Sequence, residues 1–503
     1  MKRIIKQLLF LLPLIGNAQI VQIGQDINGT DIDHLAGYSV SLSSDGMILA
    51  VAERDFTGAM PKSGRVTIAE FIDSRWQYKG MVEGSVGDRV GWATDLSADG
   101  SILAVGAPQN SDNGVYSGAV RVYKNLNGNY WQQLGKSILG AEIDDQFGRS
   151  IALSDDGNTL AIGAPLNDGN GLNSGHVRIY SYDNISDSWA QIGNDINGES
   201  SDDQSGTSVT LSADGTIVAI GAPYNDGRAS NAGQVRIFTF DGANWVQLGN
   251  DIDGGDTVGP SYNNNAGRSV SLSADGTVVA FGEPGYSGSK GRVWVYAYED
   301  SDWVIKAFKD GSGRRDDSLF GYKIILSDDG NSIVTSAIKD EPTSVDLIDC
   351  GIVQRYLIEN GSFTQIGEDI VGEASEDFSG SGLATSSNGE IIAIGAYGND
   401  DNGNQSGQVR VYGDATLSIE ENTFGNTFSL YPNPSVGKTN IVLGSNQKEA
   451  SLKIFDLNGK TIFSKSSKNV DHLEFDTTGL YEGIYIVQIK TTTNNAKLKL
   501  VVK

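Results

Sequence analysis

The sequence is poor in the residues that build metal centres and covalent cross-links. Its 503 residues include one cysteine, Cys350, and three histidines, His34, His176 and His472. A single cysteine excludes an internal disulfide framework. Zinc takes its ligands mainly from cysteine and histidine, so their scarcity argues against a zinc site.

Positive charge is also scarce. The chain has 37 Lys and Arg against 63 Asp and Glu, for a formal net charge of −26. Nucleic acids and anionic membrane surfaces are bound by basic faces, so this balance argues against both as partners. Beyond the N-terminus, no apolar run is long enough to predict a transmembrane segment.

The first 18 residues have the pattern of a secretory signal peptide. Lys2 and Arg3 precede an apolar run over residues 8–15, which is too short to span a bilayer. Small residues follow, and we expect cleavage between Ala18 and Gln19. The mature protein is therefore predicted to be secreted, either extracellular or attached to the outer-membrane surface.

Glycine, by contrast, is abundant, with 64 residues, and much of it lies in a repeat. A Ser-x-Asp-Gly motif occurs seven times, 54 to 61 residues apart, with Asn in place of Asp in the last copy. Another glycine always stands eight residues before that Asp or Asn. The turn glycines are Gly46, Gly100, Gly157, Gly215, Gly276, Gly330 and Gly389. Seven copies in one register indicate a repeat architecture.

Each repeat contains four short strand-like segments. In the third copy these are 150–153, 159–163, 175–180 and 189–196, which are alternating or largely apolar and are separated by turn residues. Four strands per repeat predict the blades of an all-β, seven-bladed β-propeller over residues 19–413. A linear stack of seven sheets is the alternative.

The two ends of the array favour closure of the ring. The seventh repeat stops after its third strand, at residues 409–412, and its missing fourth strand matches residues 21–27. We therefore expect the N-terminal strand to complete the last blade, which removes the exposed sheet edge of an open array.

The best-preserved repeat contains Phe147-Gly148 followed by Gly163-Ala164-Pro165. It resembles the FG-GAP repeats found in integrin alpha chains and many bacterial surface proteins. That family often binds calcium in a longer Asp-rich loop between the first two strands, whereas residues 154–158 here form only a short turn. Calcium needs six to eight oxygens, so we do not transfer the metal sites of the family. Asp99, Asp156, Asp214 and Asp275 are interpreted as hairpin-turn residues.

The composition changes near the C-terminus, where residues 428–503 hold ten lysines and six acidic residues. The segments 430–434, 452–459 and 480–487, followed by a lysine-rich final strand, resemble the type A C-terminal sorting domain of the type IX secretion system. This resemblance implies a bacterium of the Bacteroidota and export by that machinery as a partner. Alternating strands predict a small β-sandwich over residues 428–503, after a linker at 414–427.

Acidic pairs recur in the loops that lead into the blades. These loops and those between second and third strands share one rim, which carries the longest and most varied loops, where recognition usually occurs. We predict that this rim binds an extracellular glycan or protein through Asp144, Asp145, Asp202, Asp203, Asp316, Asp317 and Asp377.

No cofactor is expected, with weak calcium candidates as the exception. These are Asn167, Asp168, Asn170, Asp400 and Asp401, which lack the spacing of a known calcium loop. No catalytic set is recognisable in the sequence. The chain is therefore predicted to be a secreted or surface-displayed binding protein of adhesin type. The alternatives are an extracellular propeller enzyme acting on glycans and a structural surface-layer component.

Overall fold

The computed structural model describes residues 20–255, 263–311, 314–342, 347–414 and most of 429–502. Within the second unit, residues 432–434, 436, 456–460, 482 and 492–494 lie outside the description. So do the expected signal cleavage site at Ala18 and Gln19 and nearly all of the expected linker. Contacts divide the chain into Met1–Ala415 and Thr416–Lys503. Among the described residues, no helix has both the length and the hydrophobicity of a membrane span.

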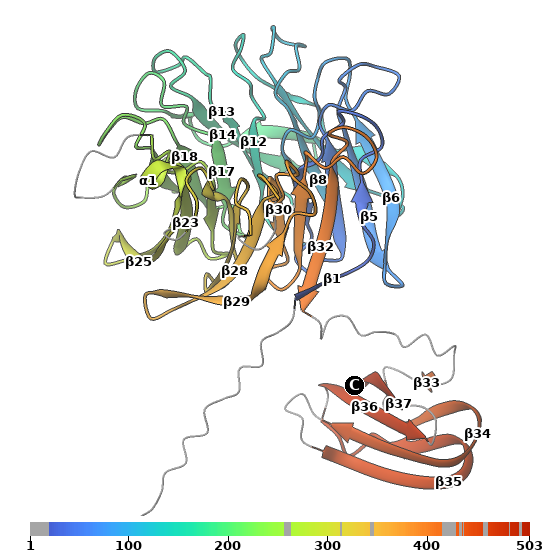
Figure 1. Ribbon diagram of the computed structural model, residues 1–503. Helices are drawn as coiled ribbons and strands as arrows, with labels where there is room; N and C mark the ends of the chain where they lie inside the picture. Colours follow the sequence, from blue (N-terminus) through green and yellow to red (C-terminus); the bar gives the residue numbers. More distant parts are fainter. Residues whose placement is uncertain are drawn as a thin grey trace, which may run out of the picture. The chain divides into compact units, whose positions relative to one another are not determined.

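The first unit consists of seven antiparallel sheets arranged around a common centre (Figure 1). The innermost strands are β3 (Ala36–Leu42), β7 (Thr94–Leu96), β12 (Ser150–Leu153), β17 (Ser208–Leu211), β22 (Val270–Leu272), β26 (Phe320–Leu326) and β30 (Gly382–Thr385). The second strands are β4 (Ile48–Glu53), β8 (Ile102–Ala107), β13 (Thr159–Ala164), β18 (Ile217–Ala222), β23 (Val278–Glu283), β27 (Ser332–Ala337) and β31 (Ile392–Ala396). This confirms the predicted seven-bladed propeller; blade 1 is the sheet that begins with β3.

The outer half of each blade is more varied. The third strands are β5 (Arg65–Ile72), β9 (Ala119–Asn125), β14 (His176–Asp183), β19 (Gln234–Phe240), β24 (Arg292–Glu299), β28 (Ile352–Glu359) and β32 (Gln408–Asp414). Three blades have one continuous outer strand, namely β6 (Arg75–Glu83), β25 (Asp302–Asp310) and β29 (Ser362–Val371). In the others it is split into β10 (Trp131–Gln133) and β11 (Ile138–Leu139), β15 (Ser188–Gln191) and β16 (Ile196–Asn197), β20 (Trp245–Gln247) and β21 (Ile252–Asp253), or β1 (Ile20–Gln22) and β2 (Ile27–Asn28). A short helix, α1 (Tyr286–Ser289), follows β23.

The chain closes on itself as the repeats predicted. Ile20 and Gln22 of β1 pair with Asp414 and Tyr412 of β32, and β2 pairs with the start of the same strand. Asp414, expected to begin the linker, is instead the last residue of β32. It pairs there with Ile20, because the latch strand extends the sheet by one residue.

The seven Ser-x-Asp-Gly turns meet at one end of the central channel. In each turn the serine hydroxyl donates to the Asp or Asn side chain, as Ser154 does to Asp156 at 2.6 Å. The residue between them donates its backbone N–H to the equivalent carbonyl of the next blade, at 2.8–2.9 Å. The bonds run through Ser44, Ala98, Asp155, Ala213, Ala274, Asp328, Ser387 and back to Ser44. This closed ring of seven hydrogen bonds forms the floor of the channel and confirms the hairpin-turn interpretation of the aspartates.

Tryptophans join neighbouring blades at their outer edges. The indole N–H of Trp245 donates to the carbonyl of Ile192 in the preceding blade at 3.0 Å, and Trp131 makes the same bond to Lys79 at 3.2 Å. The split outer strand bends at a glycine beneath this indole. At Gly193, with φ of 70°, an added Cβ would lie 2.7 Å from the ring of Trp245. The recurrent tryptophans are therefore seam residues, as predicted, and leave the rims to other side chains.

The second unit is a small all-β fold. Its strands are β33 (Ser429–Tyr431), β34 (Lys438–Phe455), β35 (Thr461–Asp476), β36 (Gly483–Thr491) and β37 (Asn495–Val502). The long β34 pairs with β33 and β35 in its first half and with β35 and β36 in its second. Apolar residues from four of the strands, among them Leu452, Leu473 and Val487, form its own buried core. The unit thus has the sheet pair that alternation in the sequence predicted.

Candidate binding site in the central cavity

The innermost strands enclose a cavity of about 370 Å³ on the propeller axis. The cavity ends short of the ring of hydrogen-bonded turns, which follow the innermost strands. Its mouth therefore lies where these strands begin, on the rim that carries the long loops. A volume of this size suits a small ligand or one end of a larger one.

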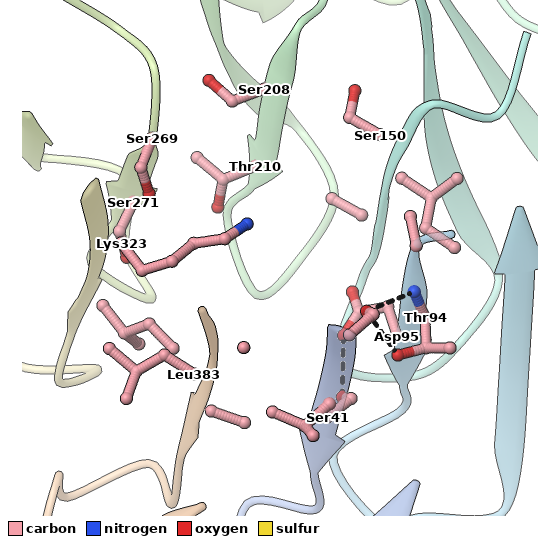
Figure 2. Close-up of a pocket in the computed structure, with 18 of the residues that line it drawn as sticks. Ser41, Thr94, Asp95, Ser150, Ser208, Thr210, Ser269, Ser271, Lys323 and Leu383 are labelled. Atoms are coloured by element: carbon pink, nitrogen blue, oxygen red, sulfur yellow. Dashed lines mark hydrogen bonds between the residues drawn. The ribbon is translucent and has the colours of Figure 1, made fainter. Parts of the chain in front are cut away.

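Serine and threonine side chains from most of the blades recur along the wall (Figure 2). Several of their hydroxyls brace adjacent blades: Ser150 donates to the carbonyl of Gly206 and Ser208 to that of Gly267, both at 2.7 Å. Others accept from the next blade, as Ser271 does from the N–H of Leu326 at 3.0 Å. A hydroxyl that accepts keeps its own hydrogen for a ligand.

Two ionisable side chains interrupt this neutral wall. Asp95 comes from blade 2 and Lys323 from blade 6, and Figure 2 shows Lys323 projecting into the cavity towards the opposite wall, where Asp95 lies. Sister blades have serine, threonine, alanine or isoleucine at the position of Asp95. No ion pair joins the two charges, so the cavity keeps a carboxyl and an ammonium group separately available.

Asp95 is held by three donors. Its Oδ2 accepts the N–H of Leu153 at 2.7 Å, and its Oδ1 accepts the N–H of Leu96 at 3.0 Å and the hydroxyl of Ser41 at 3.2 Å. Burial outweighs these bonds and raises the pKa of the carboxyl to about 6. Its charge therefore changes near neutral pH, as is common at functional sites.

This shifted pKa predicts a pH-dependent stability. The folded state binds the proton more tightly than an unfolded chain with the ordinary value of 3.8, so Asp95 lowers the free energy of unfolding as pH rises from about 4 to about 6. Asp95→Asn removes this titration. Between pH 4 and 7, the unfolding free energy of the variant should rise relative to the parent by at most about 3 kcal/mol. Any pH-independent cost of the amide facing the N–H of Leu153 cancels in that slope. Urea denaturation at several pH values measures it.

Asp99→Asn is the matched control. Burial alone would raise the pKa of Asp99, but hydrogen bonds from the N–H of Ser101 and the hydroxyl of Ser97 lower it instead. The stability that Asp99 contributes is lost only below about pH 4, so between pH 4 and 7 the curve of this variant should run parallel to that of the parent. Parallel curves for Asp95→Asn and the parent would show that Asp95 does not titrate as described.

The side chain of Lys323 is exposed to water inside the cavity, but the cavity itself is surrounded by protein. Burial, together with Arg268 and Arg149, lowers the pKa of its ammonium group, while Tyr322 opposes the shift. Among the described residues, no carboxylate lies within ion-pair distance of Lys323. The cation is thus held in the cavity without a counter-ion.

Aromatic and arginine side chains gather at the mouth. They come from the position that follows the register glycine at the start of each innermost strand. The seven residues there are Tyr38, Trp92, Arg149, Thr207, Arg268, Tyr322 and Ser381. The guanidinium of Arg149 lies 4.3 Å from the ring centre of Trp92, and that of Arg268 lies 5.4 Å from the ring centre of Tyr322. The mouth therefore combines cations with aromatic faces.

A second repeat position adds to the same cluster. Where four blades have the proline of Gly-x-Pro, blade 1 has Arg54 and blade 7 has Tyr397. The guanidinium of Arg54 lies 3.9 Å above the ring of Tyr38 and 4.4 Å from that of Trp92, while Tyr397 lies 6.0 Å from Tyr38. We call these residues, with Arg149, Arg268 and Tyr322, the mouth cluster.

The predicted acidic residues fall into two groups. Asp145, Asp203 and Asp377 are each 2% exposed and hold loops. Asp145 accepts the N–H of Glu142 at 3.0 Å and the amide of Asn167 at 3.1 Å, and Asp203 makes the equivalent bonds to Ser200 and Asn225.

The exposed acidic residues are Asp144, Asp202, Asp316 and Asp317. They lie in the loops that lead into blades 3, 4 and 6. Asp202 accepts from the amide of Asn173 at 3.0 Å, and Asp316 lies 3.4 Å from the ammonium of Lys290. These four side chains can be reached by a partner.

The weak calcium candidates organise their own loops. Asn167 accepts the N–H of Gly169, Asp168 that of Asn173 and Asp400 that of Gln405, at 2.7–2.8 Å. Asn170 donates to the carbonyls of Gly198 and Glu199, and Asp401 accepts from Gln408. Within the described ranges, no three or more His, Cys, Asp and Glu side chains come together as a metal site requires.

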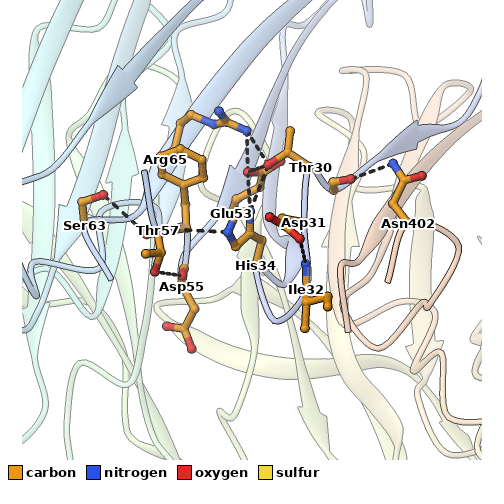
Figure 3. A network of polar contacts seen from close by, with 12 residues as sticks. Thr30, Asp31, Ile32, His34, Glu53, Asp55, Thr57, Ser63, Arg65 and Asn402 are labelled. Carbon is orange, nitrogen blue, oxygen red and sulfur yellow. Dashed lines mark hydrogen bonds and ion pairs between the residues drawn. The ribbon is translucent and has the colours of Figure 1, made fainter. Parts of the chain in front are cut away.

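A buried polar network in blade 1 surrounds His34 (Figure 3). Thr57 donates its N–H to Nε2 of His34 at 3.3 Å, and Nδ1 lies 2.9 Å from the hydroxyl of Thr30. Glu53 accepts from Arg65 at 2.6 Å and from Thr30 at 3.0 Å. His34 occupies the register position of Asp145 in blade 3. Its ring nitrogens are both engaged, so this network supports the blade rather than a ligand.

The mouth cluster, Asp95 and Lys323 were not predicted from the sequence. A signal for part of this set existed: Arg54, Tyr397, Asp95 and Lys323 each replace the small, apolar or proline residue that most sister repeats carry at the same position. The position after the register glycine carries an aromatic residue or arginine in five of the seven repeats.

Two families match parts of the chain. The FG-GAP repeat matches residues 140–180, which cover the first three strands of blade 3. The secretion system C-terminal sorting domain matches residues 429–503, the second unit. Both resemblances drawn from the sequence are thus confirmed, and the sorting domain implies secretion through the type IX system to the cell surface or the medium.

Comparisons of the whole chain give only distant similarities. No curated protein matches the chain. Among solved structures, the periplasmic gluconolactonase PpgL of Pseudomonas aeruginosa is similar, with 16% identity, a TM-score of 0.44 and coverage of 67% of this chain and 85% of that one. Sqt1 from Chaetomium thermophilum has 15% identity, a TM-score of 0.45 and coverage of 78% and 100%.

Proposed function

We propose that this chain, an FG-GAP propeller exported by the type IX secretion system through its C-terminal sorting domain, is an extracellular binding protein of adhesin type. The observation that supports this is the mouth cluster. In a repeat that otherwise keeps small residues and proline around its axis, blades 1, 2, 3, 5, 6 and 7 place arginine or aromatic side chains at one opening. Such side chains dominate the energetics of binding sites.

The position of the cluster also favours recognition. It lies on the rim of the long, varied loops, and it is half-buried rather than packed away. The ring of turns supports it from below, so the site is built on rigid strands. A preformed site of this kind loses little entropy when a ligand binds.

The acidic part of the same rim is a second contact surface in this proposal. Asp144, Asp202, Asp316 and Asp317 are exposed on the loops that lead into three of the blades. Their charge suits a basic patch on a protein partner better than a neutral glycan. The buried Asp145, Asp203 and Asp377 serve this surface by holding its loops.

The experiment that tests the proposal is a binding array of extracellular glycans and surface polymers, probed with the purified full chain and assayed for released product. Saturable binding without turnover is expected. Asp144→Asn, Asp202→Asn, Asp316→Asn and Asp317→Asn together should weaken binding to basic proteins about tenfold at low salt, with a smaller change at high salt. No saturable binding to any component would overturn the proposal.

An enzyme is the second candidate, and Asp95 is the observation that favours it. A carboxyl with a pKa of about 6 inside a cavity can transfer protons near neutral pH. Lys323 on the facing wall would stabilise negative charge. Product release that Asp95→Asn abolishes, with binding retained, would replace the binding proposal with this one.

A further inference from the structure

The mouth of the cavity concentrates positive charge in a protein whose net charge is −26. Three guanidinium groups, those of Arg54, Arg149 and Arg268, lie close enough to influence one another, and Lys323 lies below them. Burial is the main cause of the lowered pKa of Arg149, and the charges of Arg268 and Arg54 lower it further.

Among the described residues, few carboxylates lie near these cations, although the phenol of Tyr322 outweighs burial and raises the pKa of Arg268. Arg54 has one carboxylate nearby, Asp55 at 3.8 Å, which Arg89 shares at 2.9 Å. In the described part of the chain, Arg149, Arg268 and Lys323 have no carboxylate within 4 Å. Arg149 donates to the amide oxygen of Gln146 at 3.1 Å, and Arg268 to the hydroxyl of Tyr322 at 3.4 Å.

Half-buried like charges destabilise the fold unless something offsets them. Aromatic faces offset part of the cost, since a cation over a ring gains about 0.5–2 kcal/mol. An acidic protein had many carboxylates available for this role, yet none lies beside Arg149 or Arg268. An anionic ligand would supply the missing countercharge.

We propose that the central cavity binds an acidic sugar residue, with its carboxylate or sulfate held between Arg149 and Arg268 and its ring against the aromatic side chains of the mouth cluster. This inference rests on the proposed binding function and adds the ligand class. The guanidinium fork matches the oxygens of a carboxylate or sulfate, and the half-buried setting strengthens each bond.

The rest of the cavity fits the uncharged part of such a residue. A volume of about 370 Å³ accommodates one or two sugar rings. Ser269 and Ser271 accept backbone N–H groups at 3.0–3.1 Å and so keep their hydroxyl hydrogens for sugar oxygens. Asp95 can accept from sugar hydroxyls, and its charge above pH 6 repels a second acid group.

The polarity of the cavity therefore fixes the orientation of the ligand. The anionic group stays at the mouth, beside the arginines, and the neutral hydroxyls point towards Asp95. A glycan whose terminal residue carries a single acid group fits this arrangement. A small, densely charged anion gains only the contacts with the arginines at the mouth.

Isothermal titration calorimetry of the full chain tests the proposal. The probes are galacturonic acid, galactose 6-sulfate, galactose and inorganic phosphate. At least one of the two acidic sugars should bind at least tenfold more tightly than galactose and phosphate, and which of the two does so identifies the acid group. Arg149→Gln with Arg268→Gln should weaken that binding about 100-fold, because two charge-assisted contacts are lost.

The matched control is Arg75→Gln with Lys124→Gln, which removes the same charge from two exposed positions on outer and third strands. It should leave affinity unchanged within twofold. Arg149→Lys keeps the charge but not the fork, so it should lose about tenfold and serves if the double variant does not fold. Thermal melting checks folding of each variant.

Three results would overturn the inference: equal binding of acidic and neutral sugars, phosphate binding as tight as that of the acidic sugars, or unchanged affinity in folded Arg149 and Arg268 variants. If the array still shows saturable binding of another polymer, only the ligand class fails and the binding function stands. If no component binds, both fail.

Discussion

Removing residues 20–28 should destabilise the propeller, because these residues supply the strands that close its ring. This segment supplies β1 and β2, the whole outer edge of blade 7. Ile23 is buried in the core that joins blades 7 and 1, and its N–H donates to the carbonyl of Val411 at 2.8 Å. Its carbonyl also accepts the indole N–H of Trp76, at 3.2 Å.

The expected loss of stability is large. Three or four aliphatic side chains leave the core, at about 1.5 kcal/mol or more each, so the unfolding free energy should fall by about 5 kcal/mol. The melting temperature should fall by at least about 10 °C. The uncovered edge of β32 should also promote aggregation. Differential scanning calorimetry and light scattering of the full chain and the shortened chain measure both effects.

Two single substitutions make this result specific. Ile23→Ala alone should cost about 2–4 kcal/mol, because it leaves a cavity at the seam. Gln22→Ala, on the exposed face of the same strand, should change stability by less than about 0.5 kcal/mol. If the shortened chain has the same melting temperature as the parent, residues 20–28 are not needed to keep the ring stable.

Removing residues 429–503 should abolish export without changing the propeller. This segment is the sorting domain, and its buried residues form a core of their own. The shortened protein should accumulate in the periplasm, on the inner side of the outer membrane, while the full chain reaches the surface or the medium. Cell fractionation with an antibody against the propeller measures the distribution.

A smaller deletion tests whether the folded domain is needed. β37 pairs along its whole length with β36, and its Leu500 and Val502 lie in the core of the domain. Removing 495–503 should therefore block export as fully as removing the whole domain. Tyr481→Ser, at a side chain that is 90% exposed, should leave the domain folded. Export of the propeller without residues 429–503 would contradict the assignment of the sorting role.

The sequence did not predict which acidic residues of the rim loops are buried. Asp145 and Asp203 stand in acidic pairs, and the pairing suggested exposed charge. In the structure each reaches an asparagine 22 residues further along the chain, Asn167 or Asn225, beyond the first two strands of its blade. Nothing in the local sequence indicates that contact, because it depends on how the entering loop folds against the next strand pair.

The mouth cluster was not predicted from the sequence for a related reason. Arg149, Arg268 and Tyr322 occupy the same repeat position in different blades, and each stands more than fifty residues from the next. Only closure of the ring brings the starts of the innermost strands to one opening. Lys323 and Asp95 come to line one cavity in the same way, although three blades lie between them along the chain.

By itself, the sequence determined the number of blades, the turns, the latch and the sorting domain, because each follows from short-range patterns that recur in register or match along the chain. Strand alternation and the Ser-x-Asp-Gly turn are local requirements of hairpins, so they leave a visible period. The tertiary structure alone decided which carboxylates are buried, that Asp95 titrates near pH 6, and that Arg149 and Arg268 share one opening with no carboxylate of the described residues within 4 Å. Those properties depend on desolvation and on distances between blades, which sequence spacing does not specify.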